Sequence, residues 1–276
     1  TPPLKIGEVM VGESVGRVIE SKSNKFQIGD LVTIHQGWQT FIRAKDSDPS
    51  LQRVPESNLK SSVFLGAIGM PGRTAYYGLN YVGKPKAGET LVVSAASGAV
   101  GSVVGQLGKL LNCKVVGIAG GIEKAQYVTE ELKFDHCIDY KNENVEQKLN
   151  EYCSNGIDIY FENVGGEITK DVAKFLNKGA RVPICGFISK YNSPNIASEE
   201  TPFHVLGALK PKPQHRFFVV TEWLNQFEKT TAILLEHIKS GDLKYKETIT
   251  KGFENAPQAL RDVLSGKNFG KQIIEI

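Results

Sequence analysis

The stretch between residues 91 and 124 constrains the fold of this 276-residue chain more than any other. An apolar, β-branched run (91–94) is followed by Ala-Ala-Ser-Gly-Ala-Val-Gly (95–101), and then by valines and a leucine at helical spacing (103–107). This order predicts a buried parallel strand, a tight turn and a helix. In that context a G-x-G-x-x-G fingerprint indicates a dinucleotide-binding unit, here with Ala96 in the place of the first glycine.

The glycines of this unit have two interpretations. In the functional one, Gly98 lets the backbone approach a pyrophosphate, whose charge faces the free N–H groups of the following helix. In the other, the glycines serve packing alone. Gly98, Gly101, Gly105 and Gly108 fall near one helical face, so we expect the helix to lie close on its strand.

The residues after the second predicted strand (114–118) indicate which dinucleotide is bound. NAD-binding units usually carry an acidic residue about 20 positions beyond the fingerprint, which holds the ribose 2′-hydroxyl. Here Gly120 and Gly121 stand there and Lys124 follows. Glycines leave room for a 2′-phosphate and a lysine attracts it, although a solvated lysine is the alternative. Because Lys124 begins a predicted helix (123–132), where the helix dipole disfavours a cation, a functional role is favoured. The sequence therefore predicts NADP(H).

Composition argues against several other functions. The net charge of +3 is small and evenly spread, so no nucleic-acid partner is expected. No apolar stretch is long enough to span a bilayer, and residues 1–5 lack the form of a signal peptide. The four cysteines are scattered and the five histidines are isolated, so we expect no metal site and a reducing, cytoplasmic environment.

The remaining patterns predict a β-rich beginning, an alternating middle and a short mixed tail. In the beginning, strands are expected at 7–11, 15–20, 26–34 and 38–44. In the middle, further strands are expected at 137–140, 157–161, 180–185 and 216–220, and helices at 168–176 and 228–239. In the tail, strands are expected at 245–250 and 271–276, with a helix at 256–264.

Alternating strands and helices predict an α/β fold with a doubly wound parallel sheet. Pro183 is awkward inside a central strand and suggests an edge or a bulge. We expect the tail to rejoin the β-rich beginning, which gives three segments: 1–67, 68–241 and 242–276. The sheet domain would then be inserted into the other one, with a ligand cleft between the two lobes.

Six motifs occur in an order that resembles one protein family. They are Gly69-Met70-Pro71-Gly72-x-Thr74-Ala75, Ala95-Ala96-Ser97-Gly98-Ala99-Val100-Gly101, Gly120-Gly121-x-Glu123-Lys124, Glu162-Asn163-Val164-Gly165-Gly166, Cys185-Gly186-x-Ile188-Ser189-x-Tyr191-Asn192 and Gly266-Lys267-Asn268-x-Gly270-Lys271. Together they resemble the zinc-independent medium-chain dehydrogenases/reductases, in the NADP-dependent alkenal/one reductase group that includes prostaglandin reductase and leukotriene B4 12-hydroxydehydrogenase. The resemblance covers nearly the whole chain.

This resemblance implies a Rossmann domain inserted in a β-rich, GroES-like catalytic domain. It implies NADPH-dependent reduction of the C=C bond of α,β-unsaturated aldehydes and ketones. The residues it places at the cofactor are Met70, Thr74, Gly98, Ala99, Val100, Gly101, Gly121, Lys124, Tyr140, Asn163, Cys185, Gly186, Phe187, Ile188, Ser189, Tyr191, Phe218, Val219, Val220 and Asn268. Asn163 and Asn268 could instead be turn residues, and Tyr140 could simply end a strand.

The expected mechanism is hydride transfer from NADPH to the β-carbon of the substrate. Tyr191 is the candidate catalytic residue, as a proton donor or an orienting hydroxyl. The alternatives are that Tyr191 only packs on the cofactor ribose, and that water or a cofactor hydroxyl supplies the proton. The Gly-His-Glu motif of zinc-dependent relatives has no counterpart between residues 7 and 16, so no metal Lewis acid is expected.

Three expectations concern the protein as a whole. Family members begin upstream of residue 1, so the N-terminal part of the catalytic domain is expected to be missing. The loop between residues 192 and 216 is unlike that of the known relatives, in some of which it contributes a tyrosine at the substrate site. A homodimer is usual in the family. The alternative functions are a quinone reductase with the same cofactor and, if the N-terminal part is truly absent, a non-catalytic NADPH-binding protein.

Overall fold

The computed structural model describes residues 4–276. The strands are β1 (Ser14–Arg17), β2 (Leu31–Ile34), β3 (Gln52–Arg53), β4 (Thr90–Ser94), β5 (Lys114–Ala119), β6 (His136–Asp139), β7 (Ile157–Phe161), β8 (Leu176–Ile184), β9 (Gln214–Phe217), β10 (Glu247–Lys251) and β11 (Lys271–Glu275). The α-helices are α1 (Met70–Tyr77), α2 (Gly101–Leu110), α3 (Ile122–Gln126), α4 (Val145–Tyr152), α5 (Glu167–Ala173), α6 (Pro202–Ala208), α7 (Phe227–Ser240) and α8 (Ala256–Leu264). Short 3-10 and π-helical segments are η1 (Ser61–Leu65), η2 (Gly78–Gly83), η3 (Tyr127–Glu131), η4 (Ile188–Lys190), η5 (Ile196–Ser198), η6 (Val220–Gln226) and η7 (Phe253–Asn255).

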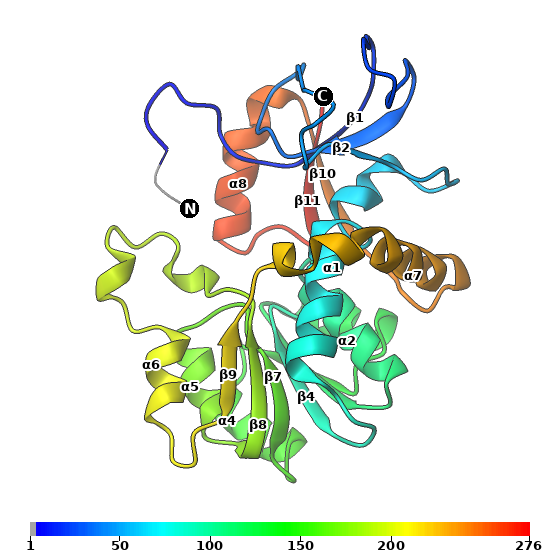
Figure 1. The fold of residues 1–276 in the computed structure, drawn as a ribbon. Coiled ribbons are helices and arrows are strands. Elements are labelled where there is room, and N and C mark those ends of the chain that lie inside the picture. Colours follow the sequence, from blue (N-terminus) through cyan, green and yellow to red (C-terminus); the bar gives the residue numbers. More distant parts are fainter. Residues whose placement is uncertain (1–3) are drawn as a thin grey trace.

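The largest sheet has six parallel strands in the order β6-β5-β4-β7-β8-β9, which confirms the doubly wound fold (Figure 1). Every residue of β4 is buried because helices cover both faces of the sheet. Leu91 and Val93 of β4 pack into one core cluster with residues of α1, α2 and α7. Val92 packs into the other cluster, with residues of α4, α5 and α6.

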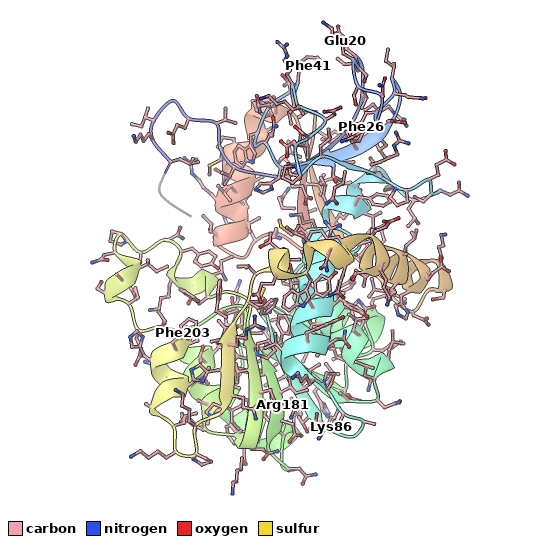
Figure 2. All side chains as sticks on the ribbon, viewed as in Figure 1. Glu20, Phe26, Phe41, Lys86, Arg181 and Phe203 are labelled. Carbon is pink, nitrogen blue, oxygen red and sulfur yellow. The ribbon has the colours of Figure 1, made fainter. Side chains whose placement is uncertain are left out.

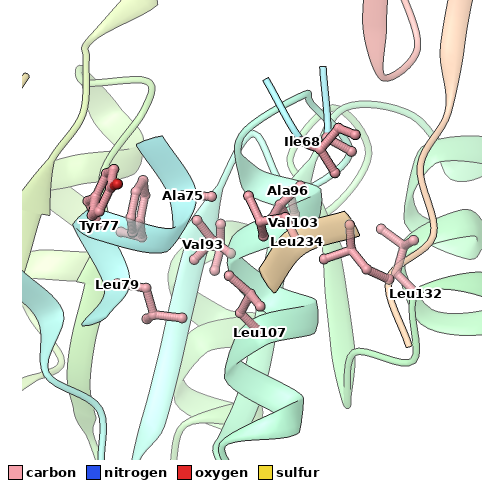
Figure 3. Close-up of a cluster of buried hydrophobic side chains, with 14 of the residues drawn as sticks. Ile68, Ala75, Tyr77, Leu79, Val93, Ala96, Val103, Leu107, Leu132 and Leu234 are labelled. Carbon is pink, nitrogen blue, oxygen red and sulfur yellow. The ribbon is translucent and has the colours of Figure 1, made fainter. Parts of the chain in front are cut away.

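Helix α2 packs against β4, where Val103 and Leu107 of the helix lie beside Val93 of the strand (Figure 3). The helix approaches β4 and β5 so closely that glycine is required at the contact. A Cβ added to Gly105 would lie 1.8 Å from Cζ of Phe134, and one added to Gly108 would lie 2.5 Å from Cδ2 of Leu91. On the sheet side, a Cβ on Gly117 would lie 2.8 Å from Cβ of Ala96. The packing role expected for the α2 glycines is thus present, together with one the sequence analysis missed, in β5.

The order of strands creates a switch point between β4 and β7. From β4 the chain proceeds to β5 and β6 on one side, and then crosses to β7, β8 and β9 on the other. In sheets of this type, ligands bind outside the carboxyl ends of the strands at such a point. The loops after β4 (95–100), after β7 (162–166) and after β8 (185–187) meet there.

The opposite end of the sheet is closed by an ion pair. Arg181 of β8 donates from Nη1 to Oε1 of Glu89 at 3.0 Å and from Nε to the carbonyl of Gly83 at 2.9 Å. Figure 2 shows Arg181 near Lys86 at this end, whereas Phe26 and Phe41 lie in the β1–β2 part of the molecule. The two ends of the sheet therefore differ. At one end an ion pair connects β8 to the segment before β4, and at the other end lies the switch point.

The N-terminal part contains fewer strands than expected. Segments 7–11 and 38–44 are not strands, and the short strand β3 was not predicted. The two predicted segments do meet, because the N–H groups of Gly37 and Trp38 donate to the carbonyls of Gly12 and Met10 at 3.0 and 2.8 Å. Gly37, with φ of +86°, turns the backbone out of the extended conformation between these two bonds, so no regular ladder forms there.

Pro183 does not lie at a sheet edge, so the edge alternative is wrong, whereas the pairing of β8 with β7 does contain a register shift, between the pairs of Ile157 and Ile159. β8 pairs with β7 on one side and with β9 on the other. The last regular register pair with β7 is Ile159 with Arg181, and beyond it the Pro183 carbonyl accepts the Glu162 N–H at 3.0 Å. Because the carbonyl and the nitrogen of a strand residue face the same neighbour, the missing N–H faces β7 beyond the last regular pair, and the pairing with β9 continues through Pro183 and Arg216.

The tail returns to the part of the molecule that holds β1 and β2. Strands β10 and β11 form a parallel pair, and Figure 1 shows them with α8 above the six-stranded sheet. Gly270 bridges to Gly98, so the tail also contacts the fingerprint turn. The segment boundaries at 67 and 241 stay a prediction. Among the described helices, none has the length and apolarity that a membrane crossing requires.

We expect Gly105→Ala to destabilise the protein by about 1–3 kcal/mol, because a new methyl group must displace the buried Phe134 ring. The matched control is Gly207→Ala on α6, where an added Cβ meets nothing within 4 Å. That change should leave stability unchanged or raise it by up to about 1 kcal/mol, through helix propensity. The free energy of unfolding in urea measures both, and equal values for the two variants would contradict the packing argument.

Candidate active site

A cleft opens at the switch point and is walled by residues from all three segments of the chain. Its lower wall contains the carboxyl-end loops of β4, β7 and β8, and its upper wall contains β1, β2, α8 and β11. Fourteen of the residues predicted at the cofactor line it: Met70, Gly98, Ala99, Val100, Gly101, Lys124, Tyr140, Asn163, Cys185, Gly186, Ile188, Ser189, Tyr191 and Asn268.

The fingerprint turn is built from close backbone contacts. Ala95 has φ of +51°, an uncommon conformation for a residue with a side chain. A Cβ on Gly101 would lie 2.3 Å from the carbonyl oxygen of Ala95, so no other residue type fits there. Helix α2 begins at Gly101, and no side chain caps it. The N–H groups of Ser102 and Val104 already donate to the carbonyls of Gly98 and Val100, each at 3.0 Å, so an anion here would meet the N–H groups of residues 99–101 and the positive end of the helix dipole.

The structure adds a cation beside this turn that sequence reasoning missed. Lys271 of β11 lines the cleft, and it also lines a small cavity together with Ala99 and Ser102. Burial lowers the pKa of the Lys271 amine, and the negative charge of Glu13 partly opposes that shift. The Gly266–Lys271 motif pointed to this segment, but only the fold shows that β11 passes beside the fingerprint.

Lys124 and Tyr140 flank the glycines that follow β5. The Lys124 amine donates to the carbonyl of Gly266 at 2.7 Å, and no described carboxylate forms an ion pair with it. Burial, and then the positive charge of Lys141, lower the pKa of Lys124. Tyr140 packs so closely that a Cβ on Gly120 would lie 2.8 Å from its ring. The partly buried Lys124 amine therefore lies near a glycine segment that has no side chains of its own.

A buried carboxylate organises the loop after β7. Glu162 is 0% exposed, and its Oε1 accepts the N–H groups of Val164 at 2.8 Å and Gly165 at 3.0 Å. Its Oε2 accepts the hydroxyl of Thr169, and Ser94 places its hydroxyl 3.1 Å from Oε1. Strand β4, the loop after β7 and helix α5 are therefore joined at one carboxylate.

The residues next to Glu162 form the cleft wall. Asn163 donates from Nδ2 to the carbonyl of Ser94 at 2.7 Å, and its own carbonyl accepts the Ile188 N–H at 3.1 Å. The carbonyl of Glu162 accepts the N–H groups of Cys185 and Gly186 at 2.9 and 3.2 Å. These bonds tie the loops after β7 and β8 into one rigid surface.

Cys185 and Tyr191 differ in what they can do chemically. Burial, and then the charge of Glu162, raise the pKa of the Cys185 thiol to about 12, so it stays protonated and is a poor nucleophile. The Tyr191 hydroxyl stands over Gly186, where an added Cβ would lie 2.6 Å from it. Burial raises the pKa of Tyr191, and a protonated phenol on a cleft wall can donate a hydrogen bond.

Six predicted residues do not line the cleft: Thr74, Gly121, Phe187, Phe218, Val219 and Val220. The Thr74 hydroxyl donates to the carbonyl of Met70 at 2.7 Å, within α1. The Gly121 N–H donates to Oδ1 of Asp139 at 2.6 Å. Phe218 is 2% exposed and packs against Phe161 and Trp223, because β9 already ends at Phe217.

Among residues 4–276, no group of three or more histidine, cysteine or acidic side chains is placed to hold a metal ion. The polar groups on the lower wall of the cleft and at β11 include backbone N–H groups, the amines of Lys124 and Lys271, and the hydroxyls of Tyr140 and Tyr191. Such a set suits a ligand with phosphate groups at one end and a planar, weakly polar group at the other.

Comparison with known proteins shows similarity along the whole chain. A family described as zinc-binding dehydrogenase matches residues 99–222, and one described as the N-terminal domain of oxidoreductase matches residues 1–53. NADPH-dependent curcumin reductase of Escherichia coli (strain K12) is 42% identical over 282 residues, which cover 100% of this chain and 80% of that protein. Prostaglandin reductase 1 of Sus scrofa is 41% identical over 276 residues, which cover 99% of this chain and 83% of that protein.

Solved structures show the same relationship. The crystal structure of CurA from Vibrio vulnificus in complex with NADPH is 41% identical and superimposes with a TM-score of 0.90, covering 100% of this chain and 82% of that one. The Escherichia coli quinone oxidoreductase complexed with NADPH is 19% identical with a TM-score of 0.79, a likeness of fold alone.

Proposed function

This chain belongs to the medium-chain dehydrogenase/reductase superfamily, in the group of NADP-dependent alkenal reductases, and from that premise we propose that it reduces the C=C bond of α,β-unsaturated aldehydes and ketones with NADPH. The observation that carries the proposal is a partly buried lysine amine, that of Lys124, in the region where an NAD-binding unit places a carboxylate. The curcumin, prostaglandin and 2-alkenal reductases among its relatives support the reaction type.

The cleft suits a dinucleotide phosphate along its full length. Gly98 to Gly101 would hold the pyrophosphate, because this turn lines the cleft and no side chain caps α2 where the turn ends. Lys124 and Tyr140 would hold the 2′-phosphate. Asn163 and the turn from Cys185 to Tyr191 would surround the nicotinamide and its ribose, together with Met70 and Asn268.

When bound, NADPH supplies a hydride, which forms a C–H bond at the β-carbon of the substrate. The electron pair of the C=C bond moves toward the carbonyl oxygen, and the α-carbon then takes a proton. In this chain, Tyr191 is proposed to donate a hydrogen bond to that oxygen or to pass on the proton. Asn163 and Gly186 form the wall against which the reacting groups are held.

The partner of this site is thus proposed to be a small-molecule enone or enal.

The edge strand β9 leaves one side of its backbone unpaired in the sheet, and its Phe217 is 46% exposed. A homodimer through this edge, and a cytoplasmic location, stay predictions.

The reaction is tested by following NADPH absorbance with a medium-chain 2-alkenal, identifying the product, and repeating the assay with a quinone. We expect the saturated aldehyde as product, with NADPH consumed in preference to NADH.

In Lys124→Ala, loss of a charge-assisted hydrogen bond to the 2′-phosphate should raise KM for NADPH about 10–100-fold, while KM for NADH changes by less than about twofold.

The matched control is Lys178→Ala, which removes an exposed lysine from the start of β8, away from the cleft. It should leave both KM values unchanged. An equal rise in KM for NADPH and NADH in Lys124→Ala would contradict the assignment of Lys124. Turnover of the quinone without turnover of the alkenal would contradict the proposed substrate class.

Tyr191→Phe removes a hydroxyl from the cleft wall while keeping the ring that packs on Phe187. We expect kcat to fall at least about tenfold, since a positioned proton donor contributes on the order of 10²–10⁴-fold, with Kd for NADPH within about twofold. Tyr81→Phe, which loses only a bond to Gln226, is the control. Unchanged kcat in Tyr191→Phe would remove this hydroxyl from the chemistry.

A further inference from the structure

Glu162 is a buried carboxyl group that forms no ion pair with any described cation. Its side chain is fully buried, and none of the lysine, arginine or histidine side chains of residues 4–276 forms an ion pair with it. The carboxylate oxygens accept from neutral donors, which are two backbone N–H groups and the hydroxyls of Ser94 and Thr169. The buried hydroxyl of Tyr160 also lies beside this group. Donors directed at both oxygens are what an ionised carboxylate requires, because it can only accept hydrogen bonds.

The local structure lessens the cost of this charge without cancelling it. Helix α5 begins five residues later, at Glu167, and the partial positive charge of its N-terminus favours a nearby anion. That effect is a fraction of a unit charge. Burying a carboxylate without a counter-charge remains unfavourable, and a neutral amide could accept the same two backbone N–H groups. Loop shape alone therefore does not explain a carboxylate here.

The position of the charge indicates what it acts on. Glu162 directly follows β7, and its carbonyl binds the N–H groups of Cys185 and Gly186 at the end of β8. Asn163, Val164, Cys185 and Gly186 all line the cleft. The carboxylate thus lies one residue behind the wall of the switch point, in a low-dielectric interior where charges act strongly.

We propose that Glu162 is a positioning residue whose negative charge favours the oxidised, positively charged nicotinamide at this wall. The inference rests on the proposed function, which places the nicotinamide between Asn163 and Tyr191. Loss of a hydride from NADPH leaves its ring with one additional positive charge, while the substrate gains the hydride and then a proton. A fixed anion behind the ring stabilises that change, and it therefore favours hydride donation.

The test is the ratio of two affinities, Kd for NADP⁺ divided by Kd for NADPH, measured by calorimetry or cofactor fluorescence without substrate. In Glu162→Gln the ratio should rise about tenfold, the effect of removing one unit charge at moderate distance, and the rate of hydride transfer should fall. Glutamine fits the site, since its amide oxygen can accept from Val164 and Gly165 while its NH₂ group donates to the hydroxyl of Thr169.

Two further variants separate charge from loop shape. Thr169→Val removes a hydrogen bond to Glu162 but keeps the charge, so it should change both Kd values by the same factor. Glu162→Asp keeps the charge, and its ratio should stay within about twofold of the wild type. A ratio that is unchanged in Glu162→Gln, or that changes as much in Thr169→Val, would overturn the proposal.

The wild-type protein offers an independent measurement should Glu162→Gln fail to fold. With the charge in place, NADP⁺ should bind at least as tightly as NADPH, and a wild type that prefers NADPH more than tenfold would overturn the inference. A wild type that binds neither dinucleotide would contradict the proposed function itself. The two failures are therefore distinguishable.

Discussion

The cleft depends on how closely α2 approaches β4 and β5. Three positions at this contact, Gly101, Gly105 and Gly117, have no room for a Cβ. Because the helix lies directly on the strands, its first turn opens at the carboxyl end of β4. The same short distance holds Phe134 and Leu91 in the core beneath. The close packing of α2 on the sheet therefore also determines where the start of α2 faces the cleft.

Much of the fold could be predicted from sequence because its signals are local. Strand β7 and helix α8 have the bounds that their apolar patterns predict, at 157–161 and 256–264. The parallel sheet followed from the alternation of elements, and its strand order then places the loops of the motifs together. Fourteen predicted cofactor residues meet in one cleft for this reason. Turn glycines and buried strands are readable without knowledge of distant contacts.

What the sequence could not show depends on contacts between distant segments. The place of Lys271 beside the fingerprint turn arises only when β11 returns to the sheet. Phe218 was expected at the cofactor, but its burial against Trp223 is set by where β9 ends. Likewise, the Glu-Asn-Val-Gly-Gly motif reveals a turn, whereas the full burial of Glu162 requires β4 and α5 on either side.

The bridge between Gly98 and Gly270 also sets the order in which the site can be completed during synthesis. The fingerprint turn leaves the ribosome long before the tail does, since about 170 residues separate the two glycines. At roughly 5–20 residues per second, the nascent chain waits on the order of 10–30 s with this turn uncovered. The six-stranded sheet can fold in that interval, but the upper wall of the cleft is complete only after β11 has emerged.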